Sequence, residues 1–367
     1  MKKVCHITSA HMQRDIRILI KECVSLSKNY DVHLVVLNGN DEVYNKVTIH
    51  STSYPIKRRL DRFTKGVKAV YKKALEVDAD VYHLHDPELL QVAKKLKRRN
   101  KIVIFDAHED LPAQIKGKYW INKYLRGIVA WAAYTYENRT VKKIDAVVTA
   151  TPFIAERFKG IGKVVANINN YPLLNELESA TDWSQKAKEA CYIGGATEIR
   201  GCTELVEAFD DKLDMTVNFA GNYSPDNYRG QLMLLHGWKY VKEHGFVGRK
   251  EVAEILGRSK YGLVMFQAFQ NHIEAQPNKM FEYMSAGIPV VTSNFPLWKQ
   301  IVEGNKCGIC VEPKDPAAIN KALLYLVQHD AIAQQMGDNG RKAVVEKYNW
   351  EQEEIKLLAL YQQLLQE

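Results

Sequence analysis

The sequence contains no apolar run of the roughly 18 residues that a membrane-spanning helix needs. Its six cysteines are scattered over 367 residues, which argues against a disulfide framework and favours a reducing compartment. The opening segment, Met1 to Lys3 followed by a short and partly polar stretch, is too short and too polar for a signal peptide and predicts a first strand. We therefore expect a cytoplasmic protein.

The length fits two ordinary domains better than one, and the composition is that of a globular protein. Charge is spread unevenly, because residues 1–170 contain 31 Lys and Arg against 17 Asp and Glu, whereas residues 171–367 contain 20 against 26. A basic half indicates an anionic partner. A membrane surface, a phosphorylated acceptor and nucleic acid all fit, although no nucleic-acid fold signature or basic-aromatic repeat supports the last.

Strands and helices alternate along the first half. Apolar runs at 4–8 and 31–37 predict strands, and the spacing of apolar residues between them predicts a helix over about 14–28. Further alternation implies a parallel sheet. Within the helix, Lys21 and Glu22 fit either a solvated, salt-bridged face or a role in a binding site.

Two predicted strands of this half end in polar clusters. His85 and Asp86 follow the strand at 81–84, and Asp106, His108, Glu109 and Asp110 lie where the strand from Ile102 leaves the sheet. Because the carboxyl ends of parallel strands share one edge of a sheet, these clusters predict the wall of a binding site. A metal site is one interpretation, but no His-x3-His spacing or paired cysteine accompanies the clusters.

Three other spacings are interpreted as structural. Asp78 and Asp80 have the Asp-x-Asp spacing of a metal motif but precede a strand, which predicts a turn. Cys307 and Cys310 lie in a predicted strand without a second cysteine pair, which favours simple burial. His83 is interpreted as a hydrogen-bonded structural residue.

The segment 261–292 organises the second half. Its apolar ends predict two buried parallel strands, Pro277 and Asn278 predict a helix start, and Gly287 predicts the helix end. Glu274 and Glu282 flank the helix start with seven residues between them. A helix start after a strand favours an anionic ligand, and the carboxylates favour hydroxyl-rich groups beside it.

The order strand, Glu274, seven residues, Glu282, Ala-Gly-Ile-Pro and strand resembles the donor site of family 4 retaining glycosyltransferases with the GT-B fold. The opening Asp-x-Arg-Ile-x-x-Lys-Glu at 15–22 is similar to one branch of that family. The resemblance covers nearly the whole chain. It implies an α/β protein of two Rossmann-like parallel-sheet domains facing a central cleft, with a C-terminal helix that crosses back to the N-terminal domain.

The polar segment 167–182 marks the expected domain junction. We expect an N-terminal acceptor-side domain at 1–170, a C-terminal donor-binding domain at 171–347, and a final helix at 348–367 that packs on the first domain.

The resemblance also implies roles for single residues. His108 and Glu274 would contact the transferred sugar as the catalytic residues, and Glu282 would bind the ribose. The expected donor-binding set is Gly194, Gly195, Arg200, Arg249, Gln276, Asn278, Lys279, Met280 and Glu282. The expected acceptor-side set is His11, Arg14, Asp15, His85, Asp86 and Glu109.

This sequence departs from the family pattern G-R-x4-K-G after the first strand of the second domain. Gly195 stands where the Arg would be, and Arg200 stands in place of the Lys. Arg200 keeps a fork that can grip a phosphate, and Lys279 could supply the second cation. Pro277 removes one backbone N–H that a glycine-rich loop would offer.

Two basic segments bear on location. Residues 57–73 are basic and amphipathic, and 118–143 combine Trp and Tyr with Lys and Arg flanks. Either is a solvated or core helix, or a contact with an anionic membrane. We expect a cytoplasmic enzyme with peripheral association at the inner face of the plasma membrane.

The function implied is a metal-independent, cofactor-free retaining transfer of a sugar from a nucleotide-diphosphate donor, UDP favoured, to a saccharide or lipid-diphosphate-linked acceptor. The expected pathway is bacterial cell-surface polysaccharide synthesis, with no nucleic-acid partner. A sugar-nucleotide 2-epimerase of the same architecture would need no acceptor. A non-catalytic protein that binds an anionic surface is the alternative from another class.

Overall fold

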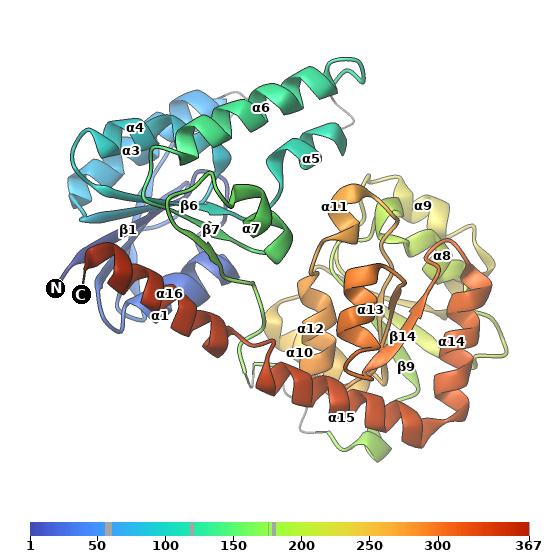
Figure 1. Cartoon of the computed structure of the whole chain (residues 1–367). Coiled ribbons are helices and arrows are strands. Elements are labelled where there is room, and N and C mark those ends of the chain that lie inside the picture. Colours follow the sequence, from blue (N-terminus) through green and yellow to red (C-terminus); the bar gives the residue numbers. More distant parts are fainter. Residues whose placement is uncertain (56–60, 118–120, 175, 178–180, 367) are drawn as a thin grey trace. The chain divides into compact units, whose positions relative to one another are not determined.

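The computed structural model describes residues 1–55, 61–117, 121–174, 176–177 and 181–366, and it divides into two compact units (Figure 1). Unit 1 consists of Met1–Asn170 with Glu351–Glu367, and unit 2 is Tyr171–Trp350. Both units are parallel α/β structures, as expected from the alternation of strands and helices. Within the described part of the chain, no helix is long and apolar enough to cross a membrane.

Unit 1 is built on an eight-stranded sheet in the order β3-β4-β2-β1-β5-β6-β7-β8. All neighbouring pairs are parallel except β3 and β4, which form an antiparallel pair at the edge of the sheet. The sequence did not predict this antiparallel pair. The strands are β1 (Lys3–Ile7), β2 (Asp31–Leu37), β3 (Glu42–Tyr44), β4 (Val47–Thr52), β5 (Val81–Leu84), β6 (Ile102–Ala107), β7 (Ala146–Thr149) and β8 (Val165–Asn167).

Helices cover both faces of this sheet. One face carries a core cluster drawn mainly from α3, α4 and α7, and α6 lies on the same side, while η1, α1 and α16 lie on the other (Figure 1). The helices are η1 (Ile16–Cys23), α1 (Val24–Leu26), η2 (Arg62–Gly66), α3 (Val67–Val77), η3 (Pro87–Leu89), α4 (Leu90–Lys97), α5 (Leu111–Gly117), α6 (Arg126–Val141), α7 (Pro152–Phe158) and α16 (Trp350–Leu365).

The helix predicted at 14–28 is shorter and of a different kind. Asp15 caps it by accepting a hydrogen bond from the Ile18 N–H at 2.9 Å, and η1 is a π-helix that passes into α1. The solvated interpretation of Lys21 and Glu22 is wrong, because Lys21 is 3% exposed and Glu22 is fully buried. A π-helix has more residues per turn than the α-helix that the pattern assumed, so successive side chains point in other directions, and such turns often occur at functional sites.

The end of the chain returns to unit 1. Glu353 on α16 accepts hydrogen bonds from the Asn169 backbone N–H at 2.9 Å and from its side-chain amide at 3.3 Å. Further along the helix, Tyr361 is fully buried and contacts His83 on β5. The final helix therefore contributes to the polar core of the first unit.

Unit 2 contains a six-stranded, wholly parallel sheet in the order β11-β10-β9-β12-β13-β14. The strands are β9 (Glu189–Ile193), β10 (Thr216–Ala220), β11 (Val241–Gly245), β12 (Tyr261–Val264), β13 (Val290–Ser293) and β14 (Gly308–Val311). Strand β11 ends at Gly245, whose φ of +65° breaks the extended chain.

Apolar clusters on the two faces of this sheet are covered by helices. The helices are η4 (Trp183–Gln185), η5 (Glu198–Arg200), α8 (Cys202–Glu207), α9 (Tyr228–Leu232), η6 (His236–Tyr240), α10 (Arg249–Arg258), α11 (Gln270–Ile273), α12 (Asn278–Ser285), α13 (Pro296–Val302), α14 (Pro316–Gln328) and α15 (Asp330–Glu346). Pro277 is the N-cap of α12, and Gly287 follows it with φ +67°, as the sequence predicted.

The structural interpretations of the metal-like spacings agree with the structure. Asp78 ends α3 in the left-handed conformation, and Asp80 accepts the Lys3 backbone N–H at 2.9 Å, so the segment is a turn. Cys307 is buried and Cys310 half-buried, both as free thiols.

Candidate active site

The polar clusters of unit 1 lie at the carboxyl ends of three adjacent strands. β5 lies between β1 and β6, with His6 opposite His83 and Leu84 opposite Phe105 in the two registers. Parallel strands place their carboxyl ends at one edge of the sheet, so the residues after them converge there. The structure brings His85, Asp86 and His108 together in this way.

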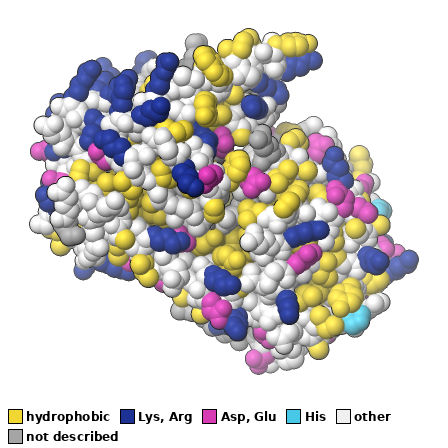
Figure 2. All heavy atoms as spheres, in the orientation of Figure 1, with side chains coloured by type: hydrophobic (Ala, Val, Ile, Leu, Met, Phe, Trp, Pro, Cys, Tyr) yellow, Lys and Arg dark blue, Asp and Glu magenta, His cyan; other side chains and the backbone are white. Residues whose placement is uncertain are grey.

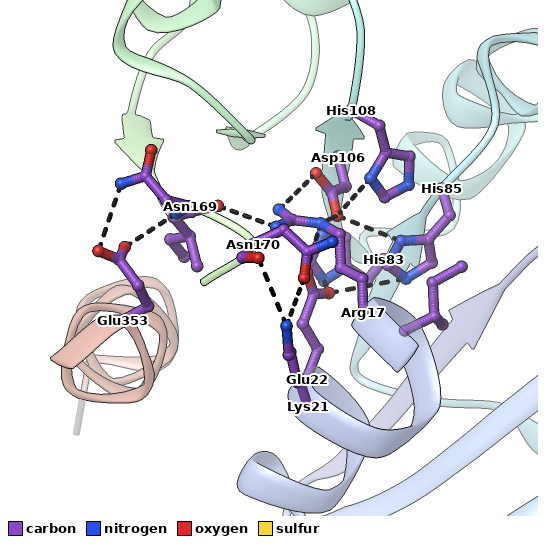
Figure 3. A network of polar contacts seen from close by, with 12 residues as sticks. Arg17, Lys21, Glu22, His83, His85, Asp106, His108, Asn169, Asn170 and Glu353 are labelled. Carbon is purple, nitrogen blue, oxygen red and sulfur yellow. Dashed lines mark hydrogen bonds and ion pairs between the residues drawn. The ribbon is translucent and has the colours of Figure 1, made fainter. Parts of the chain in front are cut away.

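A buried charge network underlies this edge (Figure 3). Arg17 on η1 donates from Nε to Asp106 Oδ2 and from Nη2 to Asp106 Oδ1, both at 3.0 Å, and from Nη1 to the Ile168 carbonyl at 2.9 Å. Its Nε also lies 3.1 Å from Glu22 Oε1. This bidentate contact fixes the orientation of both side chains and favours their charged forms.

The two carboxyl groups of this network differ in charge. Burial would raise the pKa of Asp106, but Arg17 and the neighbouring histidines outweigh burial and hold it well below its usual value. Burial and then the charge of Asp106 raise the pKa of Glu22 well above its usual value. Of the two carboxyl groups, Glu22 therefore holds its proton more tightly than Asp106.

Three histidines continue the network toward α16. His6 Nδ1 and His85 Nε2 share a hydrogen bond at 2.8 Å, and the Tyr361 hydroxyl lies 3.0 Å from His83 Nδ1 and 3.3 Å from His6 Nε2. Burial, followed by repulsion from neighbouring histidines, lowers the pKa of His6 and of His83 well below the usual value. These two imidazoles are therefore neutral at pH 7.

The same side chains form the groups that could hold a metal ion within the described residues. His6, Glu22, His83 and His85 offer ligand atoms within 4.8 Å of one another, and His85, Asp106 and His108 form a second such group. Several of these ring nitrogens already pair with one another or with Tyr361. The cluster is thus held together by hydrogen bonds between its own members.

His108 lies at the outer end of the network. Its ring stacks on His85 with centroids 5.6 Å apart, and its Nδ1 lies 3.5 Å from Asp106 Oδ2. Burial lowers the pKa of His108 to about 4 despite the nearby carboxylate. Nε2 has no hydrogen-bond partner among the residues that the structure describes. A neutral imidazole held by Asp106 at Nδ1 presents Nε2 as a hydrogen-bond acceptor.

The other expected acceptor-side residues are divided between this edge and the surface. His11 Nδ1 contacts Asp15 at 3.1 Å and Nε2 lies 3.5 Å from Asp86. The hydrogen bond to Asp15, opposed by burial, raises the pKa of His11. Arg14 turns away to Glu42 at 2.8 Å and is 51% exposed. Glu109 is exposed and accepts from Gln114.

In unit 2 the structure joins Glu282 to Arg249. Arg249 Nη1, at the first residue of α10, donates to Glu282 Oε1 at 2.7 Å. The other nitrogens of the same guanidinium donate to Glu176, from Nε at 2.8 Å and from Nη2 at 3.0 Å. The hydrogen bond from Arg249 keeps the Glu282 carboxylate oriented.

The glycine pair after β9 lies between two cationic side chains. Gly194 has a φ of +112°, which favours glycine, and a Cβ there would lie 3.4 Å from Lys279 Nζ. A Cβ on Gly195 would lie 3.1 Å from Arg200 Nη1, which donates to the Gly195 carbonyl at 3.0 Å. The predicted second cation, Lys279, is therefore placed beside the loop.

The remaining predicted donor residues surround the start of α12. Glu274 is the residue after α11 and is half-buried, and Asn278 is exposed at the first position of α12. Gln276 accepts a hydrogen bond from the Tyr171 hydroxyl at 2.9 Å. Met280 has its side chain in the core, and its backbone N–H donates to the Pro277 carbonyl at 3.0 Å.

Several residues of these networks were not selected from the sequence. His6 occupies an apolar strand, Tyr361 lies 278 residues from its partner His83, and Glu176 lies in the predicted linker. One signal was available: His83 and His85 are two apart in a strand, and they face the same side. In the sequence, Arg17 was recognised only as one position of the Asp-x-Arg-Ile-x-x-Lys-Glu motif at 15–22.

Comparison with known proteins supports the architecture. The family described as glycosyl transferases group 1 matches residues 175–343, and glycosyltransferase family 4 matches 16–168. The chain is 23% identical over 273 residues to the alpha-galactosylglucosyldiacylglycerol synthase of Streptococcus pneumoniae strain R6, covering 68% of this chain and 69% of that protein.

Solved structures share the fold over almost the full length. Sucrose-phosphate synthase from Thermosynechococcus elongatus aligns over 100% of this chain and 99% of its own at 16% identity, with a TM-score of 0.80. HepE from Anabaena, in complex with UDP-glucose, aligns over 99% and 100% at 12% identity, with a TM-score of 0.76. With both halves matched by glycosyltransferase families, the chain belongs to the family 4 glycosyltransferases with the GT-B fold.

Proposed function

We propose that this glycosyltransferase takes a sugar from a nucleotide-diphosphate donor, with UDP as the favoured nucleotide, and retains the anomeric configuration. The observation that carries the proposal is the joint placement of Glu282 and Lys279 on α12. They are three residues apart and so share a helix face, and Arg249 orients the carboxylate while the amine lies beside Gly194. A carboxylate for ribose hydroxyls and cations for a diphosphate are the groups that such a donor requires.

The leaving diphosphate needs charge stabilisation, and unit 2 offers it without a divalent ion. Arg200 and Lys279 flank the glycine pair. The first N–H groups of a helix have no acceptor within it, and α12 begins at Asn278. Preorganised donors of this kind stabilise charge that develops as the bond breaks. The proposed transfer is therefore metal-independent, with no cofactor besides the donor itself.

The sugar contacts are assigned from the family resemblance. Glu274, beside the helix start, would bind hydroxyls of the transferred sugar, and His108 would contact the sugar through its unpartnered Nε2. Neither residue is assigned as a covalent nucleophile, so we propose front-face displacement with a leaving phosphate oxygen as the base. UDP is favoured because HepE, which shares the fold, binds UDP-glucose.

The proposed acceptor is a saccharide or a lipid-linked molecule, in bacterial cell-surface polysaccharide synthesis. The similar protein from Streptococcus pneumoniae is named as a synthase of a glycosylated diacylglycerol, which supports an acceptor at a membrane. A protein that modifies such an acceptor gains from contact with the membrane surface.

Helix α6 offers a surface for that contact. Ile128 is 63% exposed and Trp131 68%, and Leu125 just before the helix is 50% exposed. Figure 2 shows apolar and basic side chains adjoining on the part of unit 1 that carries α6. Exposed aromatic and aliphatic side chains with Lys and Arg beside them suit the interface of an anionic bilayer. The exposed basic residues on α5 and at the two ends of α6 are Lys116, Lys123, Lys142 and Lys143.

The donor assignment is tested by a thermal-shift screen against UDP, GDP, ADP, CDP and their sugar conjugates, with and without magnesium. A ligand at a hundredfold over its Kd adds about 2.7 kcal/mol of stability. We expect one nucleotide series to stabilise the native chain equally without magnesium, and Glu282→Ala to lose the effect. Glu346→Ala, on α15 and 52% exposed, is the matched control. Stabilisation by no nucleotide would contradict the proposal.

A further inference from the structure

Lys279 is a buried residue whose side-chain nitrogen has no anionic partner among the described residues. The residue is 8% exposed, and Nζ has no hydrogen-bond acceptor in the structure. Nζ lies 3.7 Å from the centroid of the Tyr192 ring and 5.8 Å from that of Phe266. The aromatic face replaces only part of the hydration that the charged amine loses on burial.

The groups around the amine keep its charge unfavourable. Burial and then the positive charge of Arg200 lower the pKa of Lys279 to about 7, against a weaker opposing effect of the acidic groups. A large fraction of the molecules therefore carries an uncharged amine at neutral pH. The titratable and charged groups that face the amine are Cys191 and Tyr192 of β9, Arg200 of η5, Cys202 of α8, and Glu282 of α12.

We infer that Lys279 is a diphosphate ligand whose binding is coupled to a proton. The amine takes up one proton from solvent as the donor diphosphate binds beside Gly194, and the amine releases that proton when the diphosphate leaves. The inference rests on the proposed nucleotide-sugar function and names the residue that couples that binding to pH. In the ligand-free chain the Tyr192 ring covers Nζ. When the phosphate arrives, the flexible end of the Lys279 side chain therefore turns away from this ring and toward the phosphate.

The placement of the amine gives this coupling a physical basis. Gly194 has no side chain, so a phosphate oxygen can approach Nζ from the loop side. Two negative charges close to the amine favour its protonated form and offset the repulsion from Arg200. Arg200 stays charged at all relevant pH values because a guanidinium does not deprotonate in proteins. Of these two cations, only Lys279 can therefore exchange a proton on binding.

UDP-glucose is a suitable probe, because its diphosphate is a diester without an ionisation near neutral pH. Isothermal titration calorimetry at pH 8 in buffers of different ionisation enthalpy measures the protons taken up on binding. With a free pKa near 7, we expect uptake of about 0.9 proton per bound molecule at pH 8 and about 0.1 at pH 6. The Kd should rise about tenfold between pH 8 and pH 9.

Lys279→Met keeps the length and apolar stem of the side chain and removes the titrating group. It should bind UDP-glucose more weakly at pH 7, take up no proton, and show a Kd that no longer changes with pH. Lys342→Met, on α15 and 73% exposed, is the matched control and should behave as the native chain. Lys279→Arg should restore affinity without restoring the proton uptake.

The outcomes separate this inference from the function on which it rests. Binding of UDP-glucose without proton uptake, or with equal uptake in Lys279→Met, would overturn the role of Lys279 and leave the donor site in place. Failure of the native chain to bind any nucleotide sugar would overturn both. Melting temperatures of each variant, measured without ligand, distinguish a lost ligand contact from a lost fold.

Discussion

Arg17 and Asp106 form a fully paired ion pair in the interior of unit 1. Two guanidinium nitrogens donate to the two carboxylate oxygens at 3.0 Å each, with Arg17 5% exposed and Asp106 fully buried. The pair connects η1 to the end of β6, and the same carboxylate lies 3.5 Å from His108 Nδ1. The orientation of a predicted catalytic histidine thus depends on an ion pair that solvent does not reach.

Arg17→Met should destabilise unit 1 strongly. Removing one partner leaves the Asp106 charge buried without compensation, which typically costs about 3–5 kcal/mol. Urea unfolding followed by circular dichroism measures the loss. Arg14→Met is the control, because Arg14 pairs with Glu42 at the surface, where an ion pair contributes about 0–1 kcal/mol. Equal effects of the two substitutions would show that the buried pair contributes no more to the free energy of unfolding than the surface pair does.

The buried histidines should make unit 1 sensitive to acid. The pKa values of His6 and His83 are lowered on folding, so below about pH 6.5 the unfolded chain binds protons that the folded chain does not. Stability therefore falls as the pH decreases, by up to about 1.4 kcal/mol per pH unit for each such histidine. Glu22 acts in the opposite sense, because its folded pKa is raised.

His83→Gln tests this dependence, since an amide can still pair with the Tyr361 hydroxyl. Between about pH 6 and pH 5 the slope of stability against pH should decrease by roughly one proton relative to the native chain. His236→Gln, at an exposed position on η6, should leave the slope unchanged. An unaltered slope in His83→Gln would mean that His83 is already charged in the folded protein.

The sequence predicted those parts of the molecule that depend on local pattern. Strands β2 and β5 and the start of α12 at Pro277 follow from apolar runs and proline. Five of the predicted donor-side residues, Gln276, Asn278, Lys279, Met280 and Glu282, lie in one short segment whose spacing carries the family resemblance. Whether each of them binds the donor stays a prediction.

The buried network of unit 1 could not be predicted because it depends on distant contacts. Glu22 looks like a solvated helix residue until the π-helix turns it toward β1 and β5, and the contact from Tyr361 is made by the last helix of the chain. No local pattern encodes these pairings. Burial of a charge is decided by what the rest of the chain packs over it.

Arg249→Met should weaken donor binding by loosening Glu282. The carboxylate would lose the hydrogen bond at 2.7 Å that orients it, and we expect the Kd for UDP-glucose to rise about tenfold, or about 1.4 kcal/mol. Arg229→Met is the control, because Arg229 pairs with Glu243 at the surface of the same unit. An unchanged Kd, combined with loss of binding in Glu282→Ala, would show that Glu282 needs no positioning partner.

Lys279→Met should stabilise the ligand-free chain at neutral pH. In the unfolded chain the lysine keeps its proton up to about pH 10, whereas in the folded chain its pKa is about 7. Below about pH 10 the amine therefore lowers the free energy of unfolding. Removing the amine should add on the order of 2–4 kcal/mol at pH 7, and the gain should shrink as the pH approaches 10. Denaturation of Lys279→Met and Lys342→Met across this range measures it, and a less stable Lys279→Met at pH 7 would contradict the prediction.

The surface of α6 should bind anionic membranes through its apolar side chains. Ile128→Ser removes an aliphatic side chain that is 63% exposed, and Ile355→Ser on α16 removes one that is 62% exposed but lies outside the α6 surface. Because a buried isoleucine contributes about 1.5–3 kcal/mol on transfer from water, Ile128→Ser should reduce vesicle binding about tenfold or more.

Co-sedimentation with phosphatidylglycerol-containing vesicles, and with vesicles of phosphatidylcholine alone, measures the binding. We expect the native chain to prefer the anionic vesicles, to lose affinity as salt is raised, and to retain its affinity in Ile355→Ser. Equal loss in the two isoleucine variants would point to a general effect of surface polarity. Absence of binding to either vesicle would remove the membrane role of α6 while leaving the donor site of unit 2 untouched.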